Sequence, residues 1–241
     1  MRLRIKQDKR ELFEASFSIM LDEESIGGMS FRGKVGTPES EISITLGENN
    51  ISLKRKNKPE KKGLDAYRPY NITKDGIEAG EVFQASKKTG LFKSYGYQYA
   101  CIDSVEYSMF PIGFGEQGSK NPVYMGNTQI SLIKKDVFII DDMHDFNVIV
   151  RKDDDIEPTV IFIAYIFAKS FFKPGDLIKK GKVKAVTTTT EKELLDKYDE
   201  SFEIIYNSKN ITDGARIGNM TQFIPSPKGN GFSCCDIIKQ Q

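Results

Sequence analysis

The sequence has little of what most enzymes and exported proteins contain. It has no tryptophan, one histidine and three cysteines among 241 residues. Cys101, Cys234 and Cys235 are too few for a disulfide framework or a metal quartet, and adjacent cysteines rarely pair. We therefore expect reduced thiols in a cytoplasmic protein. Residues 1–6 lack the apolar core of a signal peptide, which agrees with that expectation.

An excess of charge of one sign is also missing. The chain has 35 Lys and Arg against 34 Asp and Glu, a net charge of +1. This balance excludes attraction of the whole surface to nucleic acid or membrane, so any such binding must come from a local patch. No nucleic-acid partner is expected. The longest apolar stretch is shorter than the roughly 20 residues that cross a bilayer, so no transmembrane helix is predicted either.

Catalytic motifs are absent as well. The only histidine, His144, lies in an Asp-rich segment where an exposed turn is expected, so a catalytic triad would have to recruit it from a hairpin tip. There is no G-x-S-x-G, P-loop or dinucleotide-binding turn. The glycines at 113, 115 and 118 resemble a phosphate cradle only in glycine content. We predict a protein that is not an enzyme and uses no cofactor.

What the sequence does contain is one very apolar segment, residues 158–172. Its length, the possible N-cap Asp155 and the stop at 173–175 (Lys-Pro-Gly) favour a helix over 156–172. A buried strand is the alternative, but such strands usually have about 4–8 residues. A helix without a polar face must be enclosed on all sides.

Residues 1–157 read as nine to twelve short strands separated by turns. Period-two alternation is clear in 41–46, and Asp75-Gly76 is a hairpin turn. We interpret 111–122 as a long loop, 123–134 as one strand, and 137–140 with 146–151 as the last hairpin. An apolar helix that follows so many strands is enclosed most simply inside a closed sheet. The predicted fold class is therefore mainly β, a closed antiparallel barrel around a central helix.

Residues 174–241 differ in residue pattern from the strand-rich part of the chain. One amphipathic helix is expected at about 191–206, followed by a loose tail. We divide the chain into a barrel domain, 1–173, and an extension, 174–241, that is expected to be dispensable for folding of the barrel.

The segments 1–7, 127–135 and 137–150, together with the apolar helix, resemble the tubby C-terminal-like group, which includes the phospholipid scramblases and small bacterial relatives. The resemblance covers 1–173 and implies a barrel of about twelve strands around a central helix. In that group the helix is usually near the C-terminus, whereas 68 residues follow it here. The group's phosphoinositide-binding residues do not align with particular positions of this chain, so that activity is not carried over.

The most basic run, residues 54–62, is the first candidate site. It contains six cations, namely Lys54, Arg55, Lys56, Lys58, Lys61 and Lys62. Such a run attracts anionic lipid headgroups. The alternative is a solvated loop, and the run lacks the aromatic residues typical of nucleic-acid binding.

The second candidate site is a weak calcium site at Asp141, Asp142 and Asp145, since carboxylates bind Ca²⁺ and scramblases have an acidic calcium segment near their final strands. The alternative is that these aspartates only form a turn. The acidic residues 153–155 lie too far along the chain to share that ion, at roughly 16 Å.

Taken together, these features predict a non-enzymatic binding module of tubby-like type. It would associate with an anionic membrane surface, as a peripheral protein, or with a protein partner. The alternative is a carrier of small hydrophobic ligands of lipocalin type, and an enzyme of unknown class ranks third. The helix discriminates between the first two, because a barrel filled by it has no room for a ligand.

Overall fold

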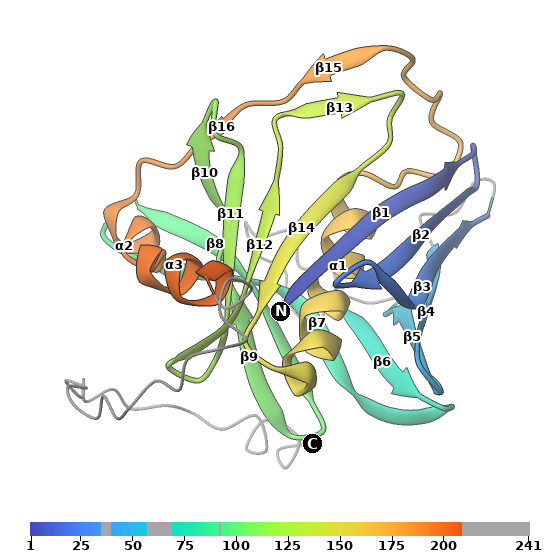
Figure 1. Ribbon diagram of the computed structural model, residues 1–241, viewed down its shortest axis with the longest axis horizontal. Coiled ribbons are helices and arrows are strands. Elements are labelled where there is room, and N and C mark those ends of the chain that lie inside the picture. The colour runs from blue at the N-terminus through green and yellow to red at the C-terminus, as the bar shows by residue number, and fades with distance from the viewer. Residues whose placement is uncertain (35–39, 57–68, 92, 209–241) are drawn as a thin grey trace.

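The computed structural model describes residues 1–34, 40–56, 69–91 and 93–208. Within these residues, twelve antiparallel strands form a closed barrel around a helix, as predicted (Figure 1). The ring follows chain order, leaves out β10 (Ile112–Gly115) and β13 (Phe138–Ile140), and closes where β14 pairs with β1. Its strands are β1 (Arg2–Arg10), β2 (Glu14–Leu21), β3 (Glu24–Gly33), β4 (Ser40–Leu46), β5 (Asn49–Arg55), β6 (Tyr70–Lys74), β7 (Ile77–Lys88), β8 (Ser94–Ile102), β9 (Val105–Met109), β11 (Ser119–Met125), β12 (Thr128–Lys135) and β14 (Asp145–Val150).

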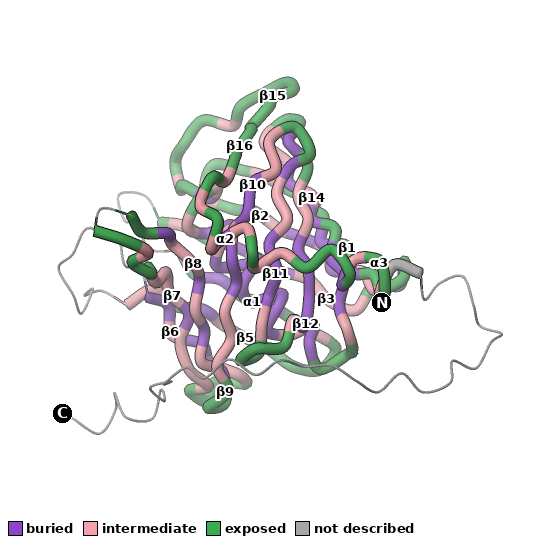
Figure 2. The backbone as a smooth tube through the Cα atoms, turned by 90° about the vertical axis from the view of Figure 1, so that its left-hand side faces the viewer, coloured by how far each residue is buried: buried purple, intermediate pink, exposed green. Residues whose placement is uncertain are grey.

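The barrel core consists of the inward halves of these strands and the helix they surround. Period-two burial is plain on β1, where Leu3, Ile5 and Gln7 face inward. The enclosed helix, α1 (Ile156–Ser170), follows a short 3₁₀ turn, η1 (Asp153–Asp155), and eleven of its fifteen residues are buried. Figure 2 shows the buried positions running along the strands around α1. The barrel interior is thus filled by side chains of α1.

The ends of α1 differ slightly from the prediction. Asp155 occupies the N-cap position without a capping side-chain bond. Its carboxylate binds Arg151 instead, at 2.9 Å, and Thr159 Oγ1 donates to the Asp155 carbonyl at 2.6 Å. The helix ends at Ser170 rather than at 172, because the chain turns to bring Phe172 back against the core.

Three predictions in the last third of the barrel were wrong. Residues 123–134 are two strands, because Gly126, with a φ of 57°, begins a turn between β11 and β12. The predicted loop 111–122 contains β10 (Ile112–Gly115) and the start of β11. The predicted last hairpin does not form, since β14 pairs with β1 and β12 whereas β13 (Phe138–Ile140) pairs with β15 (Lys182–Lys184).

The two ends of the barrel carry opposite charge. Because the strands alternate in direction, the tight turns at 22–23, 47–48, 75–76 and 103–104 meet at the end where α1 begins. Acidic residues gather there: Asp22, Glu23, Glu24, Glu48, Asp75, Asp103, Asp153, Asp154, Asp155 and Glu157. The end where α1 stops carries many cations. Both distributions complement the helix dipole, which is positive at the N-terminus of α1 and negative at its C-terminus.

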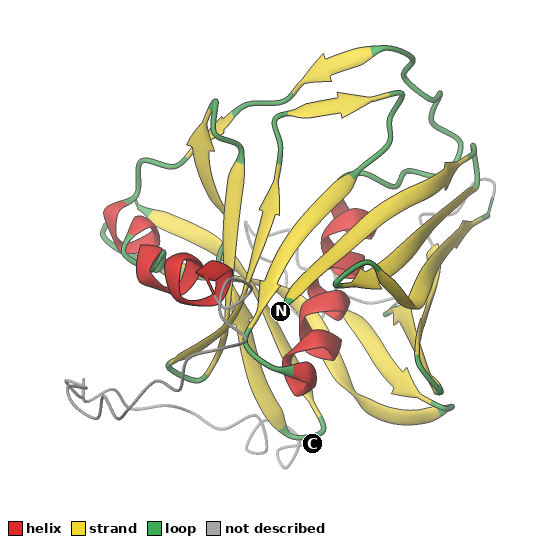
Figure 3. Ribbon diagram, in the orientation of Figure 1, coloured by secondary structure: helices red, strands yellow, loops and turns green. Residues whose placement is uncertain are grey.

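The extension crosses the barrel end where α1 stops and then packs on the outside of the wall (Figure 3). We call residues 173–188 the strap; they include β15 and β16 (Thr187–Thr188), and β16 pairs with β10.

The predicted helix at 191–206 is two helices, α2 (Lys192–Leu195) and α3 (Glu200–Ser208). Leu194 packs beside Phe110, and Phe202 covers Leu132 and Ile149. The predicted loose tail, 209–241, lies outside the described residues. Within the described part of the chain, no helix has the length and hydropathy to cross a membrane.

Candidate anion-binding mouth of the barrel

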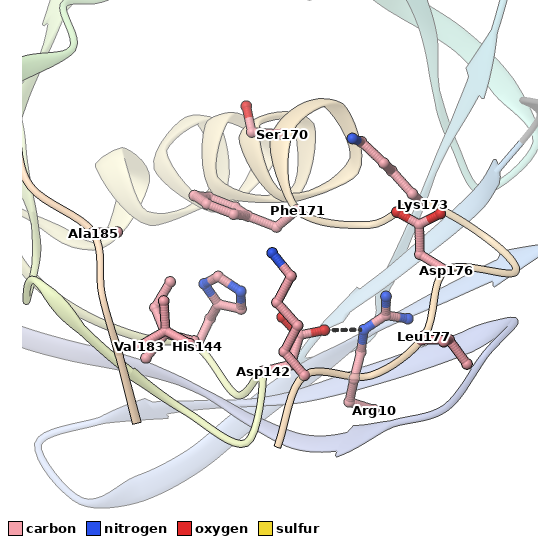
Figure 4. Close-up of a pocket in the computed structure, with 12 residues that line it drawn as sticks. Arg10, Asp142, His144, Ser170, Phe171, Lys173, Asp176, Leu177, Val183 and Ala185 are labelled. Carbon is pink, nitrogen blue, oxygen red and sulfur yellow. Dashed lines mark hydrogen bonds and ion pairs between the residues drawn. The ribbon is translucent and has the colours of Figure 1, made fainter. Parts of the chain in front are cut away.

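Two adjoining cavities open at the end of the barrel where α1 stops, and Ser170 and Phe171 line both of them. The first, about 270 Å³, lies under the strap and is lined by Arg10, Asp142, His144, Lys173 and Lys179, among others (Figure 4). The second, about 350 Å³, is lined by residues that include Gln98, Lys135, Phe146 and Lys169. We call the five cations Arg10, Lys135, Lys169, Lys173 and Lys179 the basic mouth.

A β-bulge directs Arg10 into this mouth. The register of β1 against β2 shifts between Gln7 and Lys9, so that Arg10 pairs with the inward residue Ala15. Without the extra residue, period two would turn Lys9 inward and Arg10 to solvent. The Arg10 side chain is 3% exposed, its Nε lies 3.2 Å from Asp142 Oδ2, and its guanidinium stacks over Phe172.

His144 is buried, which corrects the expectation of an exposed turn. Its exposed fraction is 3%, and its ring lies 4.3 Å from that of Phe171, measured between centroids. Burial, together with the positive charges of Lys135 and Arg10, lowers the pKa of His144 to about 3, so the imidazole is neutral near pH 7. Its Nδ1 atom has no hydrogen-bond partner among the described residues. A buried nitrogen without a partner is thus present in the wall of the first cavity.

Lys135 is a cation of the mouth whose charge is favoured by Asp136 and Asp145, neither of which lies at ion-pair distance. It is half-buried on β12, and its Nζ lies 5.5 Å from the centroid of the Phe171 ring. It forms no ion pair within the described part of the chain, and desolvation lowers its pKa. Three other half-buried lysines have carboxylate partners. Lys74 binds Asp103 and Glu157, each at 2.5 Å, and Lys120 and Lys134 both bind Glu203.

Two amide side chains complete the second cavity. Gln98 is 6% exposed, and its Oε1 has no partner among the described residues. Lys169 donates to Gln84 Oε1, a neutral acceptor. The second cavity therefore combines the amine of Lys135, which forms no ion pair within the described residues, with a buried amide oxygen that has no partner there.

The basic run found in the sequence is only partly described. Lys54 and Arg55 end β5 on the barrel end where α1 stops, and Lys56 follows. Lys54 lies 3.9 Å from Glu41 with both side chains mostly exposed, whereas Lys56 binds Glu81 at 2.8 Å. Lys58, Lys61 and Lys62 lie outside the described residues. Lys54 and Lys56 in the described part of this run thus lie beside carboxylates.

The three candidate calcium ligands are directed to three different partners. Asp145 binds Arg4 at 2.6 Å, Asp142 binds Arg10, and Asp141 accepts a hydrogen bond from the amide of Gly181. Asp141 and Asp142 both have positive φ, as turn-forming residues do. Among residues 1–34, 40–56, 69–91 and 93–208, no group of three His, Cys, Asp or Glu side chains is placed to hold a metal ion.

The strap adds positive charge beside the mouth. Residues 173–188 contain five lysines and one acidic residue, Asp176. Lys182 stacks on Phe138 at 3.6 Å, and Lys184 binds Glu116 at 2.5 Å. Lys173, Lys179 and Lys180 are exposed. The sequence analysis assigned no site to this segment.

No family model, curated protein or solved structure matches this chain.

Proposed function

We propose that the protein is a binding module that holds an anionic, phosphate-like group in its basic mouth. The observation that supports this most is Lys135, a half-buried amine that forms no ion pair within the described residues and lines a cavity. Removing an ammonium group from water without a counter-charge is costly. A bound anion would supply that counter-charge and offset the cost.

The neighbouring cations point in the same direction. Arg10 and Lys173 line the adjoining cavity, and Lys169 lines the same cavity as Lys135. Several cations around a concave, partly apolar wall raise the local concentration of anions. The dipole of α1 favours cations at this end and so explains part of the pattern. It does not place a carboxylate at ion-pair distance from Lys135, whereas a bound phosphate group would supply the counter-charge.

Two sources carry the same phosphate chemistry, a free phosphate compound and a phospholipid headgroup. The tubby-like resemblance and the exposed strap lysines favour the headgroup, and we propose peripheral association with an anionic membrane surface. Polybasic segments gain about 1 kcal/mol per cation near such a surface. A hydrophobic-ligand carrier has less support, because α1 fills the interior of the barrel.

Inorganic phosphate and lipid vesicles distinguish the sources. We expect phosphate to raise the melting temperature of the protein at constant ionic strength, since a ligand at 100 times its Kd stabilises by about 2.7 kcal/mol. Lys135→Met should abolish this shift. Lys134→Met is the matched control, because Lys134 is the residue before Lys135 on the same strand and binds Glu203 outside the barrel. It should keep the shift.

Flotation with phosphatidylcholine vesicles, with and without phosphatidylglycerol, provides the second arm. Flotation only with the anionic vesicles, lost in Lys135→Met, would support a headgroup. A phosphate shift without flotation would indicate a free phosphate compound. Equal phosphate shifts in the parent, Lys135→Met and Lys134→Met would mean general salt stabilisation and would contradict the proposal.

A further inference from the structure

We infer that Lys135 is a nucleophilic amine and that the basic mouth binds carbonyl compounds that carry an anionic group, as a Schiff base on Lys135. This inference rests on the proposed anion site and adds a covalent step to it. The ligand class is an aldehyde with a phosphate or similar anion, small enough for a cavity of about 350 Å³.

The position of Lys135 supports this chemistry. On β12, Leu132 and Lys134 face α3 on the outside, whereas Ile133 belongs to the barrel core. Lys135 continues the inward series of Ile133 at the point where the strand reaches the mouth. Its amine therefore enters a partly apolar cavity, where Phe146, Ile166 and Phe171 form neighbouring walls.

The lack of an ion pair separates Lys135 from the half-buried lysines Lys74, Lys120 and Lys134. A carboxylate partner holds an ammonium group in its protonated form, which has no lone pair and does not attack a carbonyl. Lys74, Lys120 and Lys134 all have such partners. Lys135 has none within the described chain, and burial lowers its pKa. The neutral amine is thus more accessible at Lys135 than at these three positions.

The step balances without any oxidant or reductant. The lone pair of the Lys135 nitrogen adds to the carbonyl carbon, and one proton passes from that nitrogen to the carbonyl oxygen, which gives a neutral carbinolamine. The nitrogen then loses its proton to solvent and forms the C=N bond as the hydroxyl group leaves, protonated, as water. The sum is amine plus aldehyde to imine plus water. Lys169 lines the same cavity as Lys135, and Arg10 and Lys173 line the adjoining cavity, so their charges attract the anionic group of such a molecule.

Pyridoxal 5′-phosphate is a suitable probe, because it combines an aldehyde with a phosphate. The parent protein is incubated with limiting probe, reduced with borohydride and digested, and the modified lysines are located by mass spectrometry. We expect Lys135 to be modified before the exposed lysines Lys88 and Lys180. Lys135→Arg keeps the charge and should lose this product, whereas Lys134→Arg should retain it.

Three further results separate this inference from the proposed function. Inorganic phosphate should protect Lys135, and pyridoxal without its phosphate should modify Lys135 more slowly. If pyridoxal and pyridoxal 5′-phosphate modify Lys135 equally, and phosphate gives no protection, Lys135 is a nucleophilic amine but the anion site is contradicted. A phosphate-dependent melting shift with labelling spread evenly over exposed lysines would keep the anion site and overturn the Schiff base. The site mapping on the parent protein decides the question even if Lys135→Arg fails to fold.

Discussion

Gln7 and His144 exchange two hydrogen bonds across the seam where β1 meets β14. The backbone amide of Gln7 donates to the His144 carbonyl at 2.9 Å, and the His144 amide donates to Gln7 Oε1 at 2.9 Å. Both residues are buried. The seam is thus fixed at the mouth by backbone groups of His144, and its imidazole is left to face the cavity.

This arrangement makes stability depend on pH through the imidazole. The pKa of His144 is lowered to about 3 in the folded protein against about 6.5 in the unfolded chain, so the unfolded state binds the proton more readily. Its contribution to stability is fully present above pH 6.5 and is lost as pH falls from 6.5 towards 3. We expect a loss on the order of 1 kcal/mol per pH unit in that window, measured by urea unfolding.

His144→Phe is the control for this effect. Phenylalanine keeps the ring packing against Phe171 and the backbone bonds to Gln7, but it does not titrate. The variant should lose less stability than the parent between about pH 6.5 and pH 5. Identical pH profiles would show that other groups cause the acid sensitivity.

The packing of α1 gives a second prediction. Ile163 and Phe167 are fully buried, in line with the prediction that the helix is enclosed on all sides, and Phe167 contacts Phe17 and Phe31 with ring centroids 4.7 Å apart. Phe167→Ala should lower the free energy of unfolding by about 3–5 kcal/mol. Ile77→Ala, at a position 73% exposed, should change it by less than about 0.5 kcal/mol. Similar urea midpoints for the two variants would contradict a filled barrel.

The extension gives a third prediction, about truncation after Gly175. The truncated chain should keep the strand-rich circular dichroism of the barrel, as the sequence analysis expected. It should also bind a hydrophobic dye and aggregate, because Leu132 and Ile149 lose the cover of Phe202. Phe202→Ala should show a weaker form of the same change. A truncated protein that stays monomeric and does not bind the dye would contradict the view that α3 covers an apolar surface of the barrel.

The basic run is the subject of the fourth prediction. If it contributes to membrane binding, replacing Lys54, Arg55 and Lys56 with Gln should weaken flotation with anionic vesicles, most clearly at low salt, because exposed charges are screened over about 8–10 Å. Replacing Lys179, Lys180 and Lys182 of the strap with Gln tests the other basic segment beside the mouth. We expect the larger loss in the strap variant, because Lys54 and Lys56 already lie beside Glu41 and Glu81. A larger loss of flotation in the variant at Lys54, Arg55 and Lys56 would instead assign the membrane-binding surface to the basic run.

Much of the fold could be predicted because its main signals are local. An entirely apolar segment such as Val160–Ala168 must be enclosed, and period-two alternation marks each strand. The pairing of β13 with β15 and of β14 with β1 could not be predicted, since it joins segments far apart in the chain. For short strands, pairing depends on tertiary contacts that no local pattern records.

The candidate site was largely missed for a similar reason. Arg10 faces inward only because of a bulge, and a bulge of one residue has no reliable sequence signal here. His144 had a usable signal, since it continues the inward series Phe146, Val148 and Val150 at period two. The acidic residues beside it favoured an exposed turn and obscured that series. Lys135 lay just beyond the predicted strand 123–134 and appeared in the sequence analysis only as the last residue of the segment 127–135.

The seam between β1 and β14 has a consequence for how the chain folds. Neighbouring strands from β1 to β9 can pair as soon as each is synthesised, but Arg2 must wait for Ile149 before the ring can close. The chain that ends β14 reaches η1 within a few residues, so α1 has to enter while this seam is still open. Contacts between such distant segments form slowly. We therefore expect the ring to close and α1 to enter the barrel together, late in folding. A nascent chain that ends before residue 170 should remain an open sheet with its apolar face uncovered.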